Sequence, residues 1–274
     1  MNFINQNHQL DEATELSVTA DGYHGHTSKS YANMIGPFGG IIASTLLKAV
    51  MIHPQCQGEP ISLTINYAAP VSDGEFTVKA NPVRTNRSTQ HWFIELLQSN
   101  DTIISGTAVL AKRRATWSST EAKMPDAPPQ DEIKPLPFLK DYPWTQSYDI
   151  RIIEGAPSIM SQGDDDKQVD SVTTQWIQDY PQRTMDFLSL TAICDAFFPR
   201  IYTRRKQLVP IGTVSLTIYF HTDAKMLAQH AADSVLGQAR ALQYYNGFFD
   251  QEAQIWSPHG HLLATTHQIV YYKE

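Results

Sequence analysis

Ser62-Leu63-Thr64-Ile65 recurs unchanged as Ser215-Leu216-Thr217-Ile218, 153 positions later in a chain of 274 residues. In both places polar and apolar residues alternate, which is the period of a β-strand that buries one face. Each copy continues into an aromatic residue, through Asn66-Tyr67 in the first and Tyr219-Phe220 in the second. Four identical residues are weak evidence alone, so a true internal repeat must also repeat the flanking pattern.

The flanks of both tetrapeptides follow the same order. A helix-like segment lies upstream of each, at 39–50 in the first half and 185–198 in the second. Downstream, each half holds three further strand candidates rich in residues that strands favour. Turn-forming runs separate these candidates, namely Ser72-Asp73-Gly74, Gln98-Ser99-Asn100-Asp101, Asn246-Gly247 and Pro258-His259-Gly260. The repeated unit is therefore one helix followed by an antiparallel meander.

The spacing of the last strand candidates sets the unit boundaries. Residues 102–105 and 261–264 lie 159 positions apart, so the second copy carries about six extra residues, a drift that is ordinary for surface loops. Between the copies, seven prolines and the acidic run Asp164-Asp165-Asp166 are typical of a linker. The sequence predicts an N-terminal unit at 1–115, a Pro-rich linker at 116–170 and a C-terminal unit at 171–274.

The element order also predicts the fold. A helix that precedes a strongly twisted antiparallel sheet is buried most simply when the sheet wraps around it, which is the hotdog arrangement of the α+β class. A lone unit leaves an edge strand and an open face unprotected, and a tandem repeat supplies the missing pairing within one chain. We expect a double hotdog, two tandem units each of a long helix wrapped by an antiparallel sheet. Further association into a homodimer or larger homo-oligomer is compatible with this fold.

The bulk composition excludes several classes of protein. A formal net charge of −7 and a pI near 5.8 argue against nucleic-acid binding over a broad surface. An anionic ligand must therefore meet a local basic segment, and the chain has two, Lys112-Arg113-Arg114 and Arg204-Arg205-Lys206. Such short runs are more often solvated loops or strand ends.

The same composition bears on cellular location. Cys56 and Cys194 are the only cysteines, so a reducing compartment is the default and the cytoplasm is the simplest location. The polar, acidic N-terminus is unlike a secretory signal. The most apolar stretch, 41–52, is interrupted by polar residues and is too short to span a membrane. We expect no membrane partner.

Several short motifs resemble, in order and spacing, those of acyl-CoA thioesterase II and its relatives. They are Phe38-Gly39-Gly40, Asn86-Arg87-Ser88, Gly212-Thr213-Val214-Ser215-Leu216 through Tyr219-Phe220-His221, and Leu263-Ala264-Thr265-Thr266-His267-Gln268. The resemblance covers most of the chain except the linker. It implies a double-hotdog fold and the hydrolysis of acyl-CoA thioesters to a free carboxylic acid and coenzyme A, an activity of fatty acid metabolism with acyl-CoA as the partner.

The resemblance also implies three catalytic residues. The family's catalytic Asp matches Asp195 on the second predicted helix, its Thr matches Thr213 on the next strand, and its Gln matches Gln268 on the last strand. All three lie in the second unit. The corresponding first-unit positions, near Gly40 and Val109, are glycine or apolar, so we expect one active site per chain.

The chain departs from better-known members of the family at two motifs. Val214-Ser215-Leu216 replaces a motif that contains an acidic residue and a histidine, and Asn86 stands where a glycine is usual. These departures bear on substrate preference more than on the chemistry.

The residue types suit thioester hydrolysis. A thioester carbonyl is already electrophilic and its thiolate leaves readily, so the reaction needs a base, a positioned water and a donor to the developing oxyanion. Asp195 can supply the base, and Thr213 and Gln268 can each accept and donate hydrogen bonds to hold the water. Gly39 and Gly40 open the first-unit helix, whose unpaired N–H groups are candidate oxyanion donors. Tight packing of helix on sheet explains the two glycines equally well.

Taken singly, the three polar residues have simpler explanations. Asp195 shares a helical face with Leu188 and Ala192, and a carboxylate on such an apolar stripe more often caps a backbone group or meets an arginine. Thr213 is more often only a strand former, and Gln268 only an exposed polar residue. The resemblance reverses this weighting for Asp195.

Two other functions stay open. A hotdog hydratase or dehydratase acting on enoyl or 3-hydroxyacyl thioesters needs a histidine paired with an acid, and His221 and His267 are the only candidates near the motif strands. A non-catalytic acyl-thioester binding protein needs the polar trio only as a hydrogen-bonded network.

The chain gives no sign of a cofactor or a metal centre. It lacks Gly-x-Ser-x-Gly, Gly-x-Gly-x-x-Gly, phosphate-loop and His-Glu-x-x-His patterns. His24-Gly25-His26 and His259-Gly260-His261 are more typical of surface histidines than of metal ligands. Cys194 has no evident basic neighbour, so it is more typical of a core residue than of a nucleophile.

Overall fold

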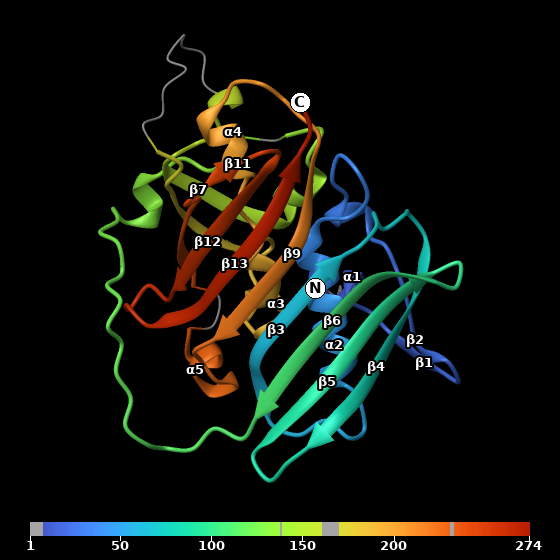
Figure 1. The fold of residues 1–274 in the computed structure, drawn as a ribbon. Helices are drawn as coiled ribbons and strands as arrows, with labels where there is room; N and C mark the ends of the chain where they lie inside the picture. The colour runs from blue at the N-terminus through green and yellow to red at the C-terminus, as the bar shows by residue number, and fades with distance from the viewer. Residues whose placement is uncertain (1–7, 138, 161–169, 231–232) are drawn as a thin grey trace, which may run out of the picture.

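The computed structural model describes residues 8–137, 139–160, 170–230 and 233–274, so the acidic run Asp164-Asp165-Asp166 lies outside the described residues. Figure 1 shows the fold. The elements in chain order are α1 (Gln9–Ala13), β1 (Ser17–Thr19), β2 (Gly22–His26), η1 (Lys29–Tyr31), α2 (Gly39–Met51), β3 (Glu59–Tyr67), β4 (Glu75–Thr85), β5 (Thr89–Gln98), β6 (Asp101–Ala111), η2 (Gln130–Glu132), η3 (Pro143–Ser147), β7 (Tyr148–Glu154), η4 (Ser158–Met160), β8 (Thr173–Asp179), α3 (Phe187–Ile193), α4 (Arg200–Arg204), β9 (Ile211–Phe220), α5 (Ala224–Gln229), β10 (Val235–Arg240), β11 (Tyr244–Tyr245), β12 (Phe248–Trp256) and β13 (Leu262–Tyr272).

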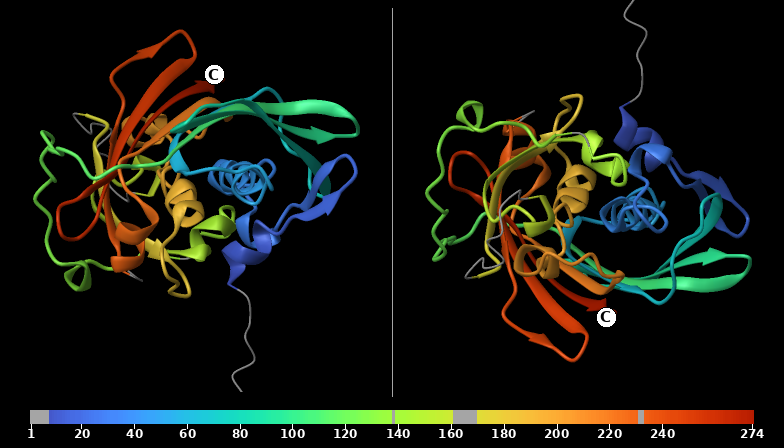
Figure 2. Two further views of the ribbon diagram at one scale, coloured as in Figure 1. Left: turned by 90° about the horizontal axis from the view of Figure 1, so that it is seen from below. Right: turned by 90° about the horizontal axis from the view of Figure 1, so that it is seen from above.

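The strands form one 13-stranded antiparallel sheet. Its order is β1-β2-β4-β5-β6-β3-β9-β13-β12-β10-β8-β7, and β11 pairs with β12 beside this path. The two halves of the sheet have the same arrangement, because each strand of the first half has a counterpart at the mirrored place in the second half. Figure 2 shows the two half-sheets curving around the central helices α2 and α3. The predicted α+β double hotdog is confirmed.

The repeated tetrapeptides lie side by side where the two units join. Strands β3 and β9 pair with the register Leu63↔Ile218, Thr64↔Thr217 and Ile65↔Leu216. The aliphatic side chains point into the core and are fully buried. Thr64 and Thr217 point to the other face, where their hydroxyl oxygens are 3.1 Å apart and hydrogen-bonded. This pairing, which we call the seam, places a local two-fold axis between the two threonines.

The predicted meanders are present in both units, as β4–β5–β6 and β10–β12–β13. Two of the turn signals form two-residue hairpins with left-handed backbone. Ser99 and Asn100 have φ of 51° and 69°, and Asn246 and Gly247 have φ of 46° and 84°. Left-handed residues at both central positions match the right-handed twist of the flanking strands. The second unit is longer mainly because α5 is inserted between β9 and β10, where the first unit has only the short connection 68–74.

The second helix is shorter than predicted. A helix was expected over 185–198, but α3 ends at Ile193 and a tight turn follows, in which Asp195 N–H donates to the carbonyl oxygen of Ala192 at 3.1 Å. Pro199 then starts a new helix, α4, as its N-cap. Because proline disfavours a helical residue before it, the apolar pattern could not continue as one helix. Asp195 therefore lies just beyond a helix end, not on a helix face.

The segment 116–170, expected to be a linker, contains regular structure. Strand β7 lies inside it and pairs with β8, in the position that β1 has in the first unit. Its prolines at 143 and 157 flank the strand rather than interrupt it, so their number alone suggested a structureless connection. The second unit's sheet therefore begins before residue 171.

The two units share one core. A single cluster of buried hydrophobic residues contains members from both halves of the chain. Helix α2 buries ten of its 13 residues, and the Ser44 hydroxyl donates to the carbonyl oxygen of Leu188 on α3 at 2.7 Å. No helix among the described residues has the length and apolar character needed to cross a membrane.

Candidate active site

A cavity of about 130 Å³ lies where the end of α3 meets the start of α2 beside β9 and β13. Asp195, Thr213, Gln268 and Gly39 all line it, so four of the five predicted site residues meet at one place. Much of the remaining wall is aromatic, formed by Phe38, Tyr142, Trp144, Phe197, Phe198 and Tyr202. A few polar groups in an apolar cavity are typical of a small-molecule site.

Asp195 and Gln268 are directly hydrogen-bonded. Gln268 Nε2 donates to Asp195 Oδ1 at 2.7 Å. The alternation of β13 turns Gln268 inward, where it is only 3% exposed, and turns His267 and Ile269 outward. Gln268 is therefore not the exposed polar residue that its type alone favours.

The first unit's helix holds the other side of the carboxylate. A Cβ atom placed on Gly39 would lie 2.8 Å from Asp195 Oδ2, so only glycine allows this approach. A Cβ atom on Gly40 would lie 2.6 Å from the carbonyl oxygen of Ala192, and the Gly40 N–H interacts with the Asp195 carboxylate. Gly40 therefore allows tight packing of α2 on α3, a helix rather than the sheet that was expected, and Gly39 allows close approach of the Asp195 carboxylate. The role of the glycine pair as oxyanion donor stays a prediction.

The surroundings of Asp195 tune its acidity. Burial raises the pKa of Asp195 from its ordinary value of 3.8 to about 7, although hydrogen bonds from Gln268 and from the Gly40 backbone favour the ionised form. Desolvation is the largest effect because burial disfavours the charged form of a carboxyl group more than these two hydrogen bonds favour it. A carboxylate with a pKa near neutrality is suited to general-base chemistry.

Thr213 lines the cavity from β9, where it pairs with Val270 of β13. The pairing of β9 with β13 shifts register between Ile269 and Val270, next to Gln268. Within the described part of the chain, the Thr213 hydroxyl is hydrogen-bonded to neither Asp195 nor Gln268. The hydroxyl thus lines the same cavity as a separate polar group.

Three further residues complete the polar surroundings, and the sequence did not single them out. Tyr67, at the end of β3, donates its hydroxyl to the carbonyl oxygen of Gly39 at 2.9 Å. Gln251 lies on β12 directly across from Gln268, is 3% exposed and lines the cavity. Arg200 donates from Nε to Gln251 Oε1 at 3.0 Å. In the sequence, the one signal for Gln251 is its place among the inward-facing positions of the alternating strand β12. Tyr67 has no such signal, because the pairing of the two units at the seam brings it to the site.

The histidines required by a hydratase lie elsewhere. His267 is exposed and pairs with Asp250 at 3.3 Å on the outer face of the sheet. His221 bonds through Nε2 to the Thr265 hydroxyl at 2.9 Å. Neither histidine lines the cavity that holds Asp195.

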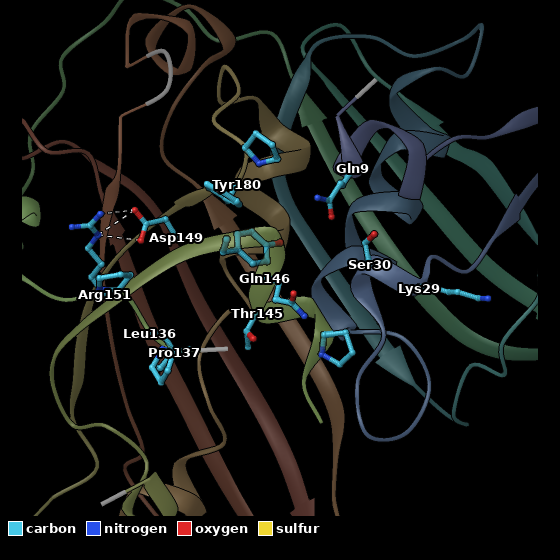
Figure 3. A pocket seen from close by; sticks show the side chains of 14 residues that line it. Gln9, Lys29, Ser30, Leu136, Pro137, Thr145, Gln146, Asp149, Arg151 and Tyr180 are labelled. Atoms are coloured by element: carbon cyan, nitrogen blue, oxygen red, sulfur yellow. Dashed lines mark hydrogen bonds and ion pairs between the residues drawn. The ribbon is translucent and has the colours of Figure 1, made fainter. Parts of the chain in front are cut away.

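A larger cavity, of about 890 Å³, lies between the N-terminal segment and residues 135–151 (Figure 3). It contains none of the predicted site residues. Of the charged residues that line it, Arg151 and Asp149 are paired with each other at 2.9 Å, and Lys29 is the third. Size alone therefore does not make it the better candidate.

Comparison with known protein families identifies both halves of the chain. The acyl-CoA thioesterase N-terminal domain family matches residues 28–111, and the acyl-CoA thioesterase C-terminal domain family matches residues 119–272. The second match starts inside the segment expected to be a linker and includes β7. Among curated proteins, none matches the chain.

Solved structures extend the comparison. A hot-dog-fold protein of unknown function from Alicyclobacillus acidocaldarius is 43% identical, with a TM-score of 0.92 over 98% of this chain and 99% of that chain. Acyl-CoA thioesterase II TesB2 from Mycobacterium marinum is 16% identical, with a TM-score of 0.74 over 96% of this chain and 98% of that chain. The tesB protein of Mycobacterium avium subs paratuberculosis is 13% identical, with a TM-score of 0.75 over 97% and 98%. The last two likenesses show the fold alone. Because the two domain families together match most of its length, the chain belongs to the acyl-CoA thioesterase family.

Proposed function

We propose that the protein hydrolyses acyl-CoA thioesters to a free carboxylic acid and coenzyme A, with Asp195 as the general base. The observation that carries this proposal is the Asp195 carboxylate in an aromatic-lined cavity, hydrogen-bonded to Gln268 and held against the start of α2. Membership of the acyl-CoA thioesterase family supports thioester hydrolysis as the general reaction.

The proposed reaction uses one water. Thr213 and Gln268 hold the water, Asp195 takes its proton, and the water oxygen attacks the thioester carbonyl carbon. A tetrahedral intermediate forms, and the C–S bond then breaks to release the thiolate of coenzyme A and the carboxylic acid. The proton taken by Asp195 passes to the thiolate or to solvent, so the base is regenerated.

The oxyanion that develops on the carbonyl oxygen needs a donor. We assign this role to the N–H of Gly39, because the N–H of Gly40 already interacts with Asp195 and Gly39 lines the cavity. Helix α2 has no side-chain cap at its N-terminus, so its first N–H groups lack the usual partner there. The first unit would thus supply the oxyanion donor and the second unit the base.

The phosphates of coenzyme A need positive charge near the cavity. Of the two basic segments, 204–206 begins at the last residue of α4, continues into the connection to β9 and is flanked by the cavity residues Tyr202 and Ile211. The other, 112–114, lies at the opposite end of β9, where Arg113 donates to the carbonyl oxygen of Phe220 at 2.6 Å. We therefore favour 204–206 as the phosphate-binding segment.

A thiol-release assay with short, medium, long and aromatic acyl-CoA substrates tests the proposal. The parent protein should release thiol, and Asp195→Asn should lower turnover by roughly 10²–10⁴-fold, the usual contribution of a general base. Asp223→Asn is the matched control. It changes a carboxylate to an amide at the N-cap of α5, where Asn caps as well as Asp.

Other results would point to the rival functions. Loss of enoyl-CoA absorbance without thiol release would identify a hydratase. Tight acyl-CoA binding without turnover, in the parent and in Asp195→Asn alike, would identify a binding protein. Equal hydrolysis by parent and Asp195→Asn would remove Asp195 from the mechanism.

A further inference from the structure

Three histidines and one aspartate meet at the end of the second unit that lies away from the proposed active site. His230 caps the C-terminus of α5, Asp233 follows it, and His259 and His261 lie in the hairpin between β12 and β13. One ligand atom each from His230, Asp233 and His259 lie within 4.8 Å of one another. The His230 ring centroid lies 5.5 Å from that of His259 and 5.9 Å from that of His261.

His230 distinguishes this cluster from ordinary surface histidines. It is 4% exposed, and neither of its ring nitrogens has a hydrogen-bond partner among the residues that the structure describes. Leaving such polar atoms buried and unpaired is costly, so a native protein normally provides a partner. Burial, and then the nearby rings of His259 and His261, lower the pKa of His230. The neutral imidazole is the form that binds metal ions.

We propose that His230, His259, His261 and Asp233 bind one Zn²⁺ ion. Three imidazole nitrogens and one carboxylate oxygen, all donors that zinc accepts, would fill the four positions of a tetrahedral ion and leave none open. His259, His261 and Asp233 are exposed, so their side chains can rotate inward to bonding distance of about 2.0–2.2 Å. The ion would supply the partner that buried His230 lacks.

The position of the site indicates a structural role. The ion would join the connection between α5 and β10 to the hairpin between β12 and β13. Gln268 lies seven positions after His261, along β13, which is roughly 23 Å in a strand. Figure 1 shows α5 and α4 at opposite ends of the second half-sheet. Zinc bound there should stabilise the fold and leave thioester hydrolysis unchanged.

The experiment compares zinc binding by three forms of the full-length chain. The protein is stripped with a chelator, the chelator is removed, and ZnCl₂ alone is titrated by calorimetry, with the visible absorption of bound Co²⁺ as a report of tetrahedral geometry. His259→Ala/His261→Ala removes two exposed ligands, so it should fold normally. His24→Ala/His26→Ala is the matched control, because it removes the same His-Gly-His sequence from β2.

The parent and the control should bind one Zn²⁺ per chain with affinities within threefold of each other and should melt at a higher temperature with zinc. The His259→Ala/His261→Ala variant should bind at least 100-fold more weakly and show no zinc-dependent rise in melting temperature. The proposal is overturned if the parent binds no zinc, or if this variant binds as tightly as the parent. It is also overturned if the His24→Ala/His26→Ala control loses the binding.

A second inference rests on the proposed function and concerns Gln251. Arg200 is fully buried, and its guanidinium donates to Gln251 Oε1 and to three other oxygens, those of Phe198, Ser171 and Thr173. Because Arg200 takes the carboxamide oxygen, the amide nitrogen is the group that Gln251 can offer to the cavity that it lines. We infer that Gln251 donates a second hydrogen bond to the thioester carbonyl oxygen, and that Arg200 is the residue that positions it.

Thiol-release kinetics test this role. Gln251→Ala should lower kcat by about 10–100-fold with KM changed less than threefold and the same inflection in the pH profile. Gln254→Ala, on the same strand but outside this cavity, is the control and should leave kcat unchanged. The inference for Gln251 is overturned if kcat is unchanged, or if the variant differs from the parent in KM alone. Failure of the proposed function is recognised separately, because the parent itself would then release no thiol.

Discussion

Replacing Asp195 with Asn should raise the free energy of unfolding relative to the parent protein, and this gain should be larger at pH 8 than at pH 4. Burial raises the pKa of Asp195 from its ordinary value of 3.8 to about 7. Keeping this carboxyl ionised in the folded state therefore costs at most about 4 kcal/mol, at 1.36 kcal/mol for each tenfold change in proton affinity. An asparagine carries no charge at any of these pH values, so the variant avoids the cost.

The sign follows from proton linkage. A carboxyl group whose pKa is higher in the folded than in the unfolded state stabilises the fold at low pH. It loses that contribution as the pH rises through the folded pKa. The parent thus loses stability between about pH 4 and pH 7, and Asp195→Asn does not. The altered hydrogen bond with Gln268 changes the variant's stability by a similar amount at every pH, so it cancels when two pH values are compared.

Urea unfolding followed by tryptophan fluorescence measures the effect, since the chain has five tryptophans. The free energy of unfolding of Asp195→Asn minus that of the parent should grow by up to about 4 kcal/mol from pH 4 to pH 8. A difference for Asp195→Asn that stays constant within about 0.5 kcal/mol would show that Asp195 titrates normally, and the argument for a base tuned by burial would be wrong.

Four further outcomes follow from the geometry. In the parent, kcat/KM should rise with pH and level off above an inflection near pH 7, because ionised Asp195 is the active form; a profile flat from pH 5 to 8 would contradict this. Gln268→Ala should lower kcat by about 10–100-fold and shift the inflection upward, because the ionised carboxylate loses a hydrogen bond; rates at several pH values check both effects. Gly39→Ala should lower kcat by about 10²-fold with little change in unfolding free energy, because its Cβ would lie 2.8 Å from the carboxylate, whereas wild-type rates would show that the close contact is unimportant. In a double-mutant cycle, Thr64→Val and Thr217→Val should couple by about 0.5–1.5 kcal/mol in urea unfolding, and strictly additive effects would mean that their hydrogen bond contributes nothing.

The sequence predicted the parts of the fold that depend on local pattern. The strand alternation around 62–65 and 215–218 identified a duplication, and the turn residues at 99–100 and 246–247 marked hairpins that the structure contains. These features are readable because one face of each strand is buried and each turn needs a particular backbone conformation. The two tetrapeptides also pair with each other. This pairing is a tertiary contact, and a local sequence pattern does not predict it.

The differences arose where local signals compete. The apolar run at 185–198 fits one helix, but the turn at Asp195 and the proline at 199 divide it. Strand β7 was missed because the prolines of 116–170 suggested a linker, and because its pairing partner β8 lies beyond the end of that segment. In the site, the resemblance supplied Asp195, Thr213 and Gln268. The neighbours Tyr67, Gln251 and Arg200 meet them only through strand pairing and contacts between distant segments.

The seam between β3 and β9 has a thermodynamic consequence. Two repeats joined by a flexible connection would melt independently, each with its own transition. Here the sheet continues from one repeat into the other and a single hydrophobic cluster draws on both. Neither half can therefore unfold without exposing core surface of its neighbour. The chain should unfold in one cooperative transition, although its sequence contains two copies of the same structural unit.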